Sequence, residues 1–312
     1  MKTQPDVVAV CVCTHKRPKM LEACLASLAI QIIPADVAPQ IIVIDNESEP
    51  NNRAAVEVFA LTCLFPVHYV HQPKRGIAVA RNTALDKAMA LNADWIAMLD
   101  DDETADSHWL AELMSPEYRH VPVLAGRRII VYPHNRPPFW HTRSKSRQQT
   151  EGETIESAFT HNVRFSRDLL DAKLRFDENI GFMGGEDGLF FKTARSIGFN
   201  AKFTQRSKTY ECVHLEREGY LGRLYSSYWQ AAERIAFKKK TPLQLIRITS
   251  MAPFHIILGI SELFLSVPMA ILGPGYFKRH ALAGGRRIAK TFGRVSAILG
   301  RLPKPYQITV GS

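Results

Sequence analysis

A short apolar segment that runs directly into three aspartates constrains the fold of this chain more than any other feature. Residues 93–99 are mostly apolar and are bounded by polar residues, which predicts a buried strand. Asp100, Asp101 and Asp102 follow where that strand should end, and ligands of open α/β sheets bind at the carboxyl ends of strands. Adjacent carboxylates repel one another, and a divalent cation offsets the repulsion. The pattern predicts a site where Mg²⁺ or Mn²⁺ holds a phosphate-bearing substrate, with a solvated acidic turn as the alternative.

The rest of the chain up to this segment alternates between strand-like and helix-like patterns. This alternation predicts an α/β fold with a mostly parallel central sheet and helices on both faces. The patterns G-x-G-x-x-G and G-x-x-x-x-G-K-[ST] do not occur, so the usual dinucleotide and P-loop fingerprints are absent. We expect strands at residues 7–13, 41–44, 67–70, 93–99, 121–126 and 128–132, and helices at residues 19–31, 53–64, around Arg81 and Asn82, and at residues 217–240.

Polar side chains follow three of the predicted parallel strands. Residues 14–17 follow the first strand, Asp45 and Asn46 follow the second, and the aspartate triplet follows the fourth. Parallel strands end along one edge of a sheet, so these groups should gather there. The sequence therefore predicts one site built from a cationic cluster, an acid–amide pair and three carboxylates.

These segments, in this order, resemble a known family. The later run Gly184-Gly185-Glu186-Asp187-Gly188-Leu189-Phe190 resembles the Glu-Asp element of the same family. Over about residues 7–215 the chain is similar to family 2 glycosyltransferases with the glycosyltransferase A fold, and within them to bacterial exopolysaccharide enzymes of the succinoglycan type. The resemblance implies an inverting transfer of a sugar from a nucleotide diphosphate, expected to be a UDP-sugar, to a hydroxyl of a lipid-linked oligosaccharide. Its motifs are Thr14-His15-Lys16-Arg17-Pro18, Ile41-Ile42-Val43-Ile44-Asp45-Asn46, Gly76-Ile77-Ala78-Val79-Ala80-Arg81-Asn82 and Leu99-Asp100-Asp101-Asp102.

The resemblance also implies roles for the residues of the donor site. Asp102 would bind the metal and Asp100 the ribose or the metal's waters, whereas Asp101 should point the other way along an extended backbone. Asn46 stands where the family more often has a second acid, which leaves the identity of the base open. The residues expected to bind the nucleotide sugar are Thr14, Arg17, Asp45, Asn46, Gly76, Arg81, Asp100, Asp101 and Asn162.

A general base must take the proton of the acceptor hydroxyl, and the resemblance implies Asp187 for this role, with Glu186 beside it. The neighbouring glycines let the backbone approach a ligand closely, and adjacent acids push their pKa values apart. Capping of a helix N-terminus is a compatible role for Asp187. His214 is the second metal-ligand candidate, because imidazole suits Mn²⁺, with a structural role as its alternative. For Arg81 the alternative to phosphate binding is an exposed surface cation.

The net charge of +10 is unevenly distributed along the 312 residues. Residues 1–233 contain 27 Lys and Arg against 29 Asp and Glu, whereas residues 234–312 contain 13 Lys and Arg against one acid, Glu262. We therefore expect a catalytic domain at 1–233, with a nucleotide-sugar half at about 1–120 and an acceptor half at about 121–233, followed by a basic tail. Such a tail indicates an anionic partner, either nucleic acid or a phospholipid surface.

The tail contains an apolar run, residues 248–277, that is long enough to cross a bilayer. Glu262 lies near its middle, where an acid costs about 3 kcal/mol, and three prolines interrupt helix geometry. Basic residues flank both ends, whereas a crossing helix favours positive charge on one side. We expect an interfacial or re-entrant pair of helices that binds anionic lipid through residues 238–304, and no nucleic acid. A spanning helix and an ordinary soluble helix are the alternatives.

Three further features concern the acceptor and the compartment. Residues 133–153 predict a long surface loop, where Phe139 and Trp140 could hold an acceptor sugar; a loop without a fixed role is the alternative. Five cysteines without metal-type spacing predict reduced thiols, and the polar residues 1–6 do not begin a signal peptide. With the resemblance and the basic tail, these features predict the cytoplasmic face of the bacterial inner membrane.

Two rival functions are open at the level of sequence. Asp100-x-Asp102-x-Thr104 fits the D-x-D-x-T pattern of haloacid-dehalogenase-type phosphatases, although that pattern normally ends the first strand rather than the fourth. The other rival is a non-catalytic scaffold attached to the membrane, for which Asp187 would be dispensable.

Overall fold

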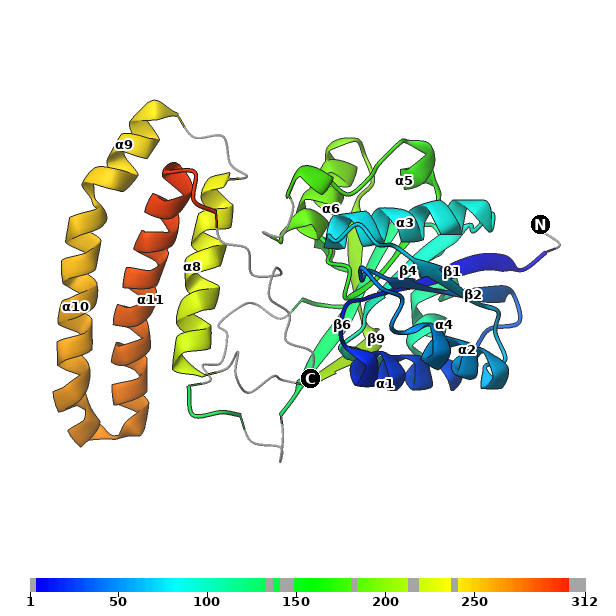
Figure 1. Ribbon diagram of the computed structural model, residues 1–312, viewed down its shortest axis with the longest axis horizontal. Coiled ribbons are helices and arrows are strands. Elements are labelled where there is room, and N and C mark those ends of the chain that lie inside the picture. The colour runs from blue at the N-terminus through cyan, green and yellow to red at the C-terminus, as the bar shows by residue number, and fades with distance from the viewer. Residues whose placement is uncertain are drawn as a thin grey trace. The chain divides into compact units, whose positions relative to one another are not determined.

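The computed structural model describes residues 4–132, 137–140, 149–180, 184–212, 219–236 and 241–302. Contacts between Cα atoms divide the chain into two compact units (Figure 1). The first unit includes the described residues up to 131 and residues 149–212, and the second includes residues 137–140 and 219–302.

The first unit is built on a single sheet. Its strands are β1 (Asp6–Thr14), β2 (Val37–Asp45), β3 (Val67–His71), β4 (Trp95–Asp100), β5 (Glu103–Ala105), β6 (Val123–Val131), β7 (Thr154–Ile155), β8 (Asn162–Ser166) and β9 (Ala201–Cys212).

The order of the strands is β3-β2-β1-β4-β8-β6-β9-β5, and β7 pairs with β9. The first four strands in this order are parallel, β8 is antiparallel to β4 and β6, and β6 is parallel to β9. The predicted α/β fold class is confirmed. The sheet is mixed rather than mostly parallel, because β8 runs antiparallel to both of its neighbours, β4 and β6.

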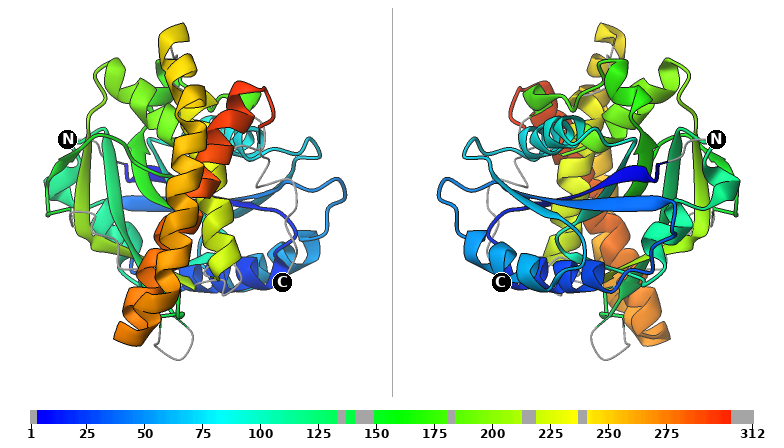
Figure 2. Two further views of the ribbon diagram at one scale, coloured as in Figure 1. Left: turned by 90° about the vertical axis from the view of Figure 1, so that its left-hand side faces the viewer. Right: turned by 90° about the vertical axis from the view of Figure 1, so that its right-hand side faces the viewer.

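Helices cover both faces of this sheet (Figure 2). The helices of the first unit are α1 (Pro18–Ala29), α2 (Arg53–Thr62), α3 (Ile77–Ala90), α4 (Trp109–Leu113), α5 (Asp168–Asp171) and α6 (Glu186–Ser196), with 3₁₀ turns at Pro116–Tyr118 and Glu178–Ile180.

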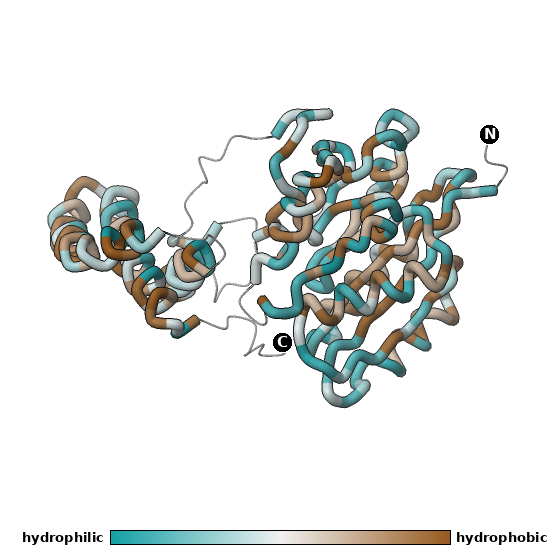
Figure 3. The backbone as a smooth tube through the Cα atoms, turned by 90° about the horizontal axis from the view of Figure 1, so that it is seen from above, coloured by the Kyte–Doolittle hydropathy of each residue, from teal (hydrophilic) through white to brown (hydrophobic). Residues whose placement is uncertain are grey.

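Two hydrophobic clusters hold the layers of the first unit together. One joins the sheet to α3, α5 and α6, and the other joins it to α1, α2 and α4. Strands β1 and β2 are almost continuously apolar because both of their faces are covered. Figure 3 shows the hydrophobic residues concentrated along the central strands of this unit.

The later strands differ from the sequence-based prediction. The strands expected at 121–126 and 128–132 are one strand, β6, with an irregularity in its pairing between Ala125 and Arg127. The apolar pattern predicts neither β8 nor β9, because Arg164 and the polar residues 204–209 interrupt it. Both strands are held by pairing within the sheet instead of by a continuous apolar run.

The second unit is a layer of three long helices in which α11 packs between α8 and α10 (Figure 1). The helices of this unit are α8 (Tyr220–Ala236), α9 (Pro242–Ser250), α10 (Ala252–Met269) and α11 (Pro274–Ile298), with a 3₁₀ turn at Ala270–Leu272.

Glycines and one ion pair fix the packing of α11. A Cβ atom on Gly284 would lie 2.5 Å from the carbonyl oxygen of Gly259 on α10, so the two backbones approach closely. Glu262 in the apolar run is paired with Arg287 of α11, with Nε–Oε2 at 3.1 Å and Nη2–Oε1 at 2.6 Å. Pro274 stands in the first turn of α11, where proline fits a helix, so it does not interrupt the geometry as predicted.

The boundaries of the second unit also differ from the sequence-based expectation. The domain boundary expected at residue 233 falls within α8, whose contacts with α11 place it in the second unit. Residues 137–140 belong to this unit too, because the Trp140 ring lies 4.7 Å from Tyr220 and 5.9 Å from Phe277. Most of the loop expected at 133–153, and residues 238–240, lie outside the described residues.

Candidate active site

The register of the parallel strands brings the ends of three strands to the same level. Thr14 pairs with Asp45 across β1 and β2, and Cys13 pairs with Asp100 across β1 and β4. The backbone N–H of Asn46 donates to the carbonyl oxygen of Thr14 at 2.9 Å, which ties the first two ends together. The three polar segments therefore lie side by side at one edge of the sheet.

Two aspartates of the triplet share one guanidinium group. Arg17 Nη1 donates to Asp101 Oδ1 at 3.0 Å and to Asp102 Oδ2 at 2.9 Å. Thr14 Oγ1 donates to Asp101 Oδ2 at 2.8 Å. The prediction that Asp101 points away from its neighbours is wrong, because β4 ends at Asp100 and the next two residues form a turn rather than a continued pleat.

Arg81 connects the triplet to the Glu-Asp element. From α3, its Nη2 lies 3.4 Å from Asp100 Oδ1, and its Nη1 pairs with Glu186 Oε1 on α6. Its side chain is 8% exposed, so the alternative of a surface cation does not apply. Desolvation alone would lower the pKa of Arg81, but the charges of Glu186, Asp100 and Asp187 raise it. Asp100 and Glu186 thus contact the same guanidinium, and the charge of Asp187 also acts on it.

The protein environment disfavours ionisation of two aspartates of the triplet, Asp100 and Asp101. Desolvation raises the pKa of Asp100 to about 7, with Arg81 opposing the rise and Asp102, Asp101 and Asp187 adding to it. Desolvation raises the pKa of Asp101 to about 6 despite Arg17. The Asp100 side chain nevertheless remains 39% exposed. A nearby cation stabilises the ionised form of an accessible carboxyl group whose pKa is raised. This is the behaviour expected of a metal ligand.

Glu103 is a fourth acid at this edge, and the sequence-based prediction does not include it. Its side chain is buried, and its Oε2 has no hydrogen-bond partner in the described part of the chain. Burial and the charge of Asp100 raise the pKa of Glu103 to about 9, against the effects of Thr209 and Arg128. Burial and the Asp100 charge both favour the neutral form of this carboxyl group, which reduces its repulsion of the triplet. The only sequence signal is its position directly after Asp102.

The Glu-Asp element begins α6, as expected for acids at a helix N-terminus. Gly185 precedes it with φ of 85°, a left-handed conformation that favours glycine. Glu186 is buried against Arg81, whereas Asp187 is only half-buried and accepts the backbone N–H of Gly188 at 2.7 Å. Of the two acids, Asp187 is the one that a substrate can reach.

Asp45 is enclosed by the protein. Its carboxylate accepts the backbone N–H of Asn52 at 2.9 Å, the side-chain amide of Asn52 at 3.2 Å and the hydroxyl of Tyr69 at 2.8 Å. It is 0% exposed. The carboxylate therefore joins the start of α2 to β3, and a role in hydrogen bonding a nucleotide base does not fit these contacts.

The Asn46 side chain likewise has partners on all of its polar atoms. Its Nδ2 donates to the carbonyl oxygens of Gln72 at 2.9 Å and Lys74 at 2.8 Å, and its Oδ1 accepts the N–H of Gly76 at 2.9 Å. Gly76 has φ of 148° and is the N-cap residue directly before α3. Asn46 thus holds the turn that leads to Arg81, which corrects the prediction of a base contact. A carboxylate could not donate to the two carbonyl groups, which explains an amide here.

Asn162 is paired with Leu99 across β8 and β4, but its side chain is directed into the core. Its Oδ1 accepts the indole N–H of Trp109 at 2.9 Å, and its Nδ2 donates to the carbonyl oxygen of Ser207 at 3.2 Å. A Cβ atom on Gly126 would lie 2.4 Å from this amide. The structure therefore gives Asn162 a packing role and does not bring its side chain to the donor site as predicted.

His161, the residue before Asn162, is close enough to Arg128 and Arg81 for their charges to act on it. Desolvation lowers the pKa of His161 to about 3, and the charges of Arg128 and Arg81 lower it further. The imidazole is therefore neutral at pH 7 and can accept or donate one hydrogen bond without adding charge.

The side chains at this edge fit a divalent cation that binds together with its substrate. Asp100 and Asp102 carry carboxylate oxygens, the hard type of ligand that suits Mg²⁺ and Mn²⁺. No group of three His, Cys, Asp or Glu residues with metal-site geometry occurs in the described residues. His214, the second predicted ligand, lies outside them. Magnesium sites often use one or two carboxylates plus substrate phosphates, so two protein ligands are sufficient.

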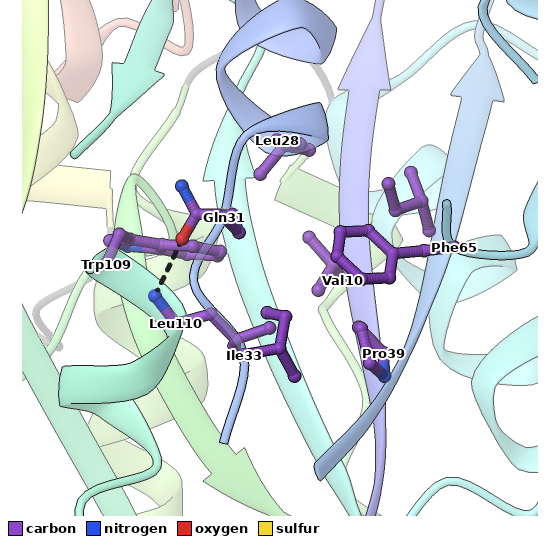
Figure 4. Close-up of a pocket in the computed structure, with 9 residues that line it drawn as sticks. Val10, Leu28, Gln31, Ile33, Pro39, Phe65, Trp109 and Leu110 are labelled. Atoms are coloured by element: carbon purple, nitrogen blue, oxygen red, sulfur yellow. Dashed lines mark hydrogen bonds between the residues drawn. The ribbon is translucent and has the colours of Figure 1, made fainter. Parts of the chain in front are cut away.

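A recess elsewhere in the first unit does not belong to this site. Figure 4 shows it between α1, β1, β2 and α4, lined mainly by apolar side chains such as Leu28, Phe65 and Trp109. Its one polar side chain, Gln31, accepts the backbone N–H of Leu110 at 3.0 Å and donates to two carbonyl oxygens. The recess is therefore a packing gap without free polar groups for a ligand.

A mixed sheet whose parallel half ends in an acidic triplet is the glycosyltransferase A fold, and solved structures with this fold match the chain. The chain belongs to glycosyl transferase family 2, which it matches over residues 9–173. The family and the fold agree with the predictions from the sequence. They do not favour the phosphatase alternative.

Three known proteins illustrate the similarity. The succinoglycan biosynthesis protein ExoM of Rhizobium meliloti (strain 1021) is 35% identical over 210 residues, which is 65% of this chain and 65% of that protein. The mannosyltransferase PcManGT of Pyrobaculum calidifontis, solved with GDP-Man and Mn²⁺, superposes with a TM-score of 0.62 at 14% identity, covering 96% of this chain and 89% of the other. TarS 1–349 of S. aureus, solved with UDP, has a TM-score of 0.53 at 18% identity, covering 94% and 91%.

Proposed function

We propose that this chain is a metal-dependent, inverting glycosyltransferase. It moves a sugar from a nucleotide diphosphate, a UDP-sugar first of all, to a hydroxyl of a lipid-linked oligosaccharide in bacterial exopolysaccharide or surface polysaccharide synthesis. Membership of glycosyl transferase family 2 and the relative in succinoglycan biosynthesis support this proposal. The structural neighbours solved with UDP and with GDP-Man support a nucleotide-sugar donor.

The donor would bind at the edge where β1, β2 and β4 end. Asp102 and Asp100 would hold Mg²⁺ or Mn²⁺, and the bound cation stabilises the negative charge that develops on the leaving diphosphate. Arg17, already beside Asp102, can give a charge-assisted hydrogen bond to a phosphate oxygen. Thr14 contributes backbone contacts to the base, and Asn46 fixes the Gly76 turn that positions Arg81.

Asp187 would act as the general base. The acceptor oxygen forms a bond to the anomeric carbon while the bond from that carbon to the diphosphate breaks, and the hydroxyl proton passes to Asp187. A single direct attack inverts the anomeric configuration. Glu186 is a positioning residue, because it contacts Arg81 rather than open space.

One observation carries the proposal. Arg81 contacts Asp100 of the triplet and Glu186 of the Glu-Asp element, which are far apart in the sequence. The charge of Asp187 also acts on Asp100. These contacts support a shared site for the proposed metal-binding acids and the proposed base, as transfer between a bound donor and an acceptor requires.

The test is a transfer assay with the purified full chain, labelled nucleotide sugars, Mg²⁺ or Mn²⁺, and bacterial lipid extract as acceptor. We expect label to enter the lipid fraction, and Asp187→Asn to reduce turnover by at least ~10² while donor affinity stays within twofold. Asp171→Asn removes an exposed acid from α5 and serves as the matched control. Full transfer by Asp187→Asn would remove Asp187 from the mechanism and favour the scaffold alternative.

The second unit suits a membrane-bound acceptor. Residues 238–304 combine an apolar run with a large excess of basic residues, so we assign to them the contact with anionic lipid at the cytoplasmic face of the inner membrane. This assignment would bring the enzyme to its lipid-linked acceptor.

A further inference from the structure

The side of α10 that does not face α11 is an apolar surface. Pro242–Leu272 form a 31-residue stretch that is long and apolar enough to cross a membrane, by length and composition. Only 11% of its most apolar 18-residue segment is buried, whereas a core helix of a soluble protein would be mostly buried. Ile257 and Phe264, seven residues apart on one face, are 64% and 74% exposed. The apolar face of α10 is the set Phe254, Ile257, Ile260 and Phe264.

The neighbouring helix α11 has most of its cations on one side. At about 100° per residue, its basic residues other than Lys278 fall within an arc of roughly 100°. One of these, Arg287, is paired with Glu262 of α10. We call the others the cationic stripe, and they are Arg279, Arg286, Lys290 and Arg294.

The members of the cationic stripe act on one another. Desolvation lowers the pKa of Lys290, and the charges of Arg286, Arg234 and Arg294 lower it further. Lys290 and Arg294 form no ion pair with a described acid. These two cations are therefore available to bind an anionic partner. Fifteen residues of helix separate its ends, which is a length of about 22 Å.

The packing of α10 on α11 restricts how either helix can meet a bilayer. A Cβ atom on Gly259 would lie 2.6 Å from Ile288 and 3.0 Å from the carbonyl oxygen of Gly284, and Glu262 pairs with Arg287. The two helices therefore run antiparallel and in contact. If α10 crossed the membrane, the cationic stripe would lie in the hydrocarbon, where each cation disfavours insertion by roughly 100-fold.

We propose that α10 and α11 form an in-plane membrane anchor, in which the apolar face of α10 lies at the boundary between acyl chains and head groups and the cationic stripe binds the phosphates of anionic phospholipids. Packed helices lie about 8–10 Å apart, so α11 reaches the head-group level when α10 is embedded by about 5–10 Å. A stripe of about 22 Å is much longer than one diphosphate group, which favours an extended lipid surface as the partner. The anchor rests on the membrane assignment of the proposed function, not on the transfer chemistry.

Vesicle flotation of the full-length protein tests the stripe. Each cation at an anionic leaflet strengthens binding about fivefold, so Lys290→Gln with Arg294→Gln should weaken binding to phosphatidylglycerol vesicles about 25-fold. The control is Lys192→Gln with Arg195→Gln, which removes the same charge from exposed positions of α6 and should change binding less than twofold. Equal loss in both variants, or no binding to anionic vesicles by the wild-type chain, would overturn the proposal.

A second pair of variants tests the apolar face. Ile257→Gln with Phe264→Gln should weaken binding to both phosphatidylglycerol and phosphatidylcholine vesicles, because insertion of apolar side chains does not depend on lipid charge. Val58→Gln with Leu61→Gln changes two exposed apolar residues of α2 and should have no effect. Unchanged binding by the first pair contradicts the assignment of this face.

Cysteine labelling distinguishes an in-plane anchor from a spanning helix. In a Cys212→Ser parent, Ser250→Cys in α9 and Gly275→Cys in α11 place thiols on either side of α10, in positions that the structure leaves exposed. In inverted inner-membrane vesicles an impermeant maleimide should label both without detergent. Labelling of one position only after detergent would show that α10 crosses the membrane.

The same variants separate failure of the anchor from failure of the proposed function. Lys290→Gln with Arg294→Gln should keep the rise in Tm that a nucleotide sugar and a divalent cation give the wild-type chain, because the donor-site residues belong to the first unit. If vesicle binding behaves as expected but no nucleotide sugar raises Tm, the anchor stands and the transferase proposal fails. The opposite result leaves the transferase and removes the anchor.

Discussion

Arg81 is the residue that joins the two acidic segments of the candidate site. It is buried, and it contacts Asp100 at the end of β4 and Glu186 at the start of α6. A buried ion pair is not necessarily a source of stability, but removal of one partner leaves an uncompensated charge. This guanidinium therefore compensates the charges of Asp100 and Glu186. Arg17 compensates the charges of Asp101 and Asp102 in the same way.

Arg81→Gln should lower the free energy of unfolding by about 3–5 kcal/mol, because Glu186 would be left buried without its partner. The double variant Arg81→Gln with Glu186→Gln should be less destabilised than Arg81→Gln alone. Urea unfolding measures both. Arg175 pairs with Asp86 at 3.2 Å in an exposed position, so Arg175→Gln is the control, with an expected loss of about 0–1 kcal/mol. A similar small loss for Arg81→Gln would contradict this account of the buried pair.

Among the elements, the turn between β3 and α3 depends on the side chain of Asn46. Its amide donates to two carbonyl groups and accepts one N–H, and so fixes the start of the helix that carries Arg81. A local contact at the end of β2 thus determines where a charged residue of the site lies.

Asn46→Asp should destabilise the chain by about 3 kcal/mol, because a carboxylate cannot donate to the carbonyl groups of Gln72 and Lys74 and repels both. Asn92→Asp adds the same charge at an exposed turn and should change stability by less than about 0.5 kcal/mol. Thermal or urea unfolding of the two variants makes the comparison. Equal stability of Asn46→Asp and the wild-type chain would show that the turn does not need the amide.

The sequence predicts the elements of the parallel half and their common edge, but not the orientation of several side chains. Strands β1, β2 and β4 are predicted because burial of both faces leaves continuous apolar runs, and their polar ends follow from the parallel register. Asp101 faces the other direction from the one predicted, because a turn replaces the extended backbone. The role predicted for Asn162 and the omission of Glu103 have a common reason, because the burial of both side chains depends on β8 and β9, whose sequences lack the strand pattern.

At the scale of the whole molecule, the two units have separate tasks in this account. The donor-site residues lie in the first unit, and the apolar face and cationic stripe lie in the second. Ending the chain after Lys240 removes α9, α10 and α11 and should release the protein from anionic vesicles. The rise in Tm with a nucleotide sugar and a divalent cation should persist. Continued sedimentation of the shortened chain with lipid would contradict this division.

The central claim is that Asp102, through a divalent cation, holds the diphosphate of a nucleotide sugar beside Asp187. The most direct measurement is calorimetric donor binding, with Mn²⁺ or with chelator, for the wild-type chain, Asp102→Ala and Asp187→Asn. Loss of a residue that supports a metal ligand lowers metal affinity or activity by about 10–100-fold. Loss of a ligand itself should therefore weaken donor binding at least ~100-fold. We predict binding that requires the metal, is lost in Asp102→Ala and is kept in Asp187→Asn; unchanged, metal-independent binding by Asp102→Ala would contradict the account.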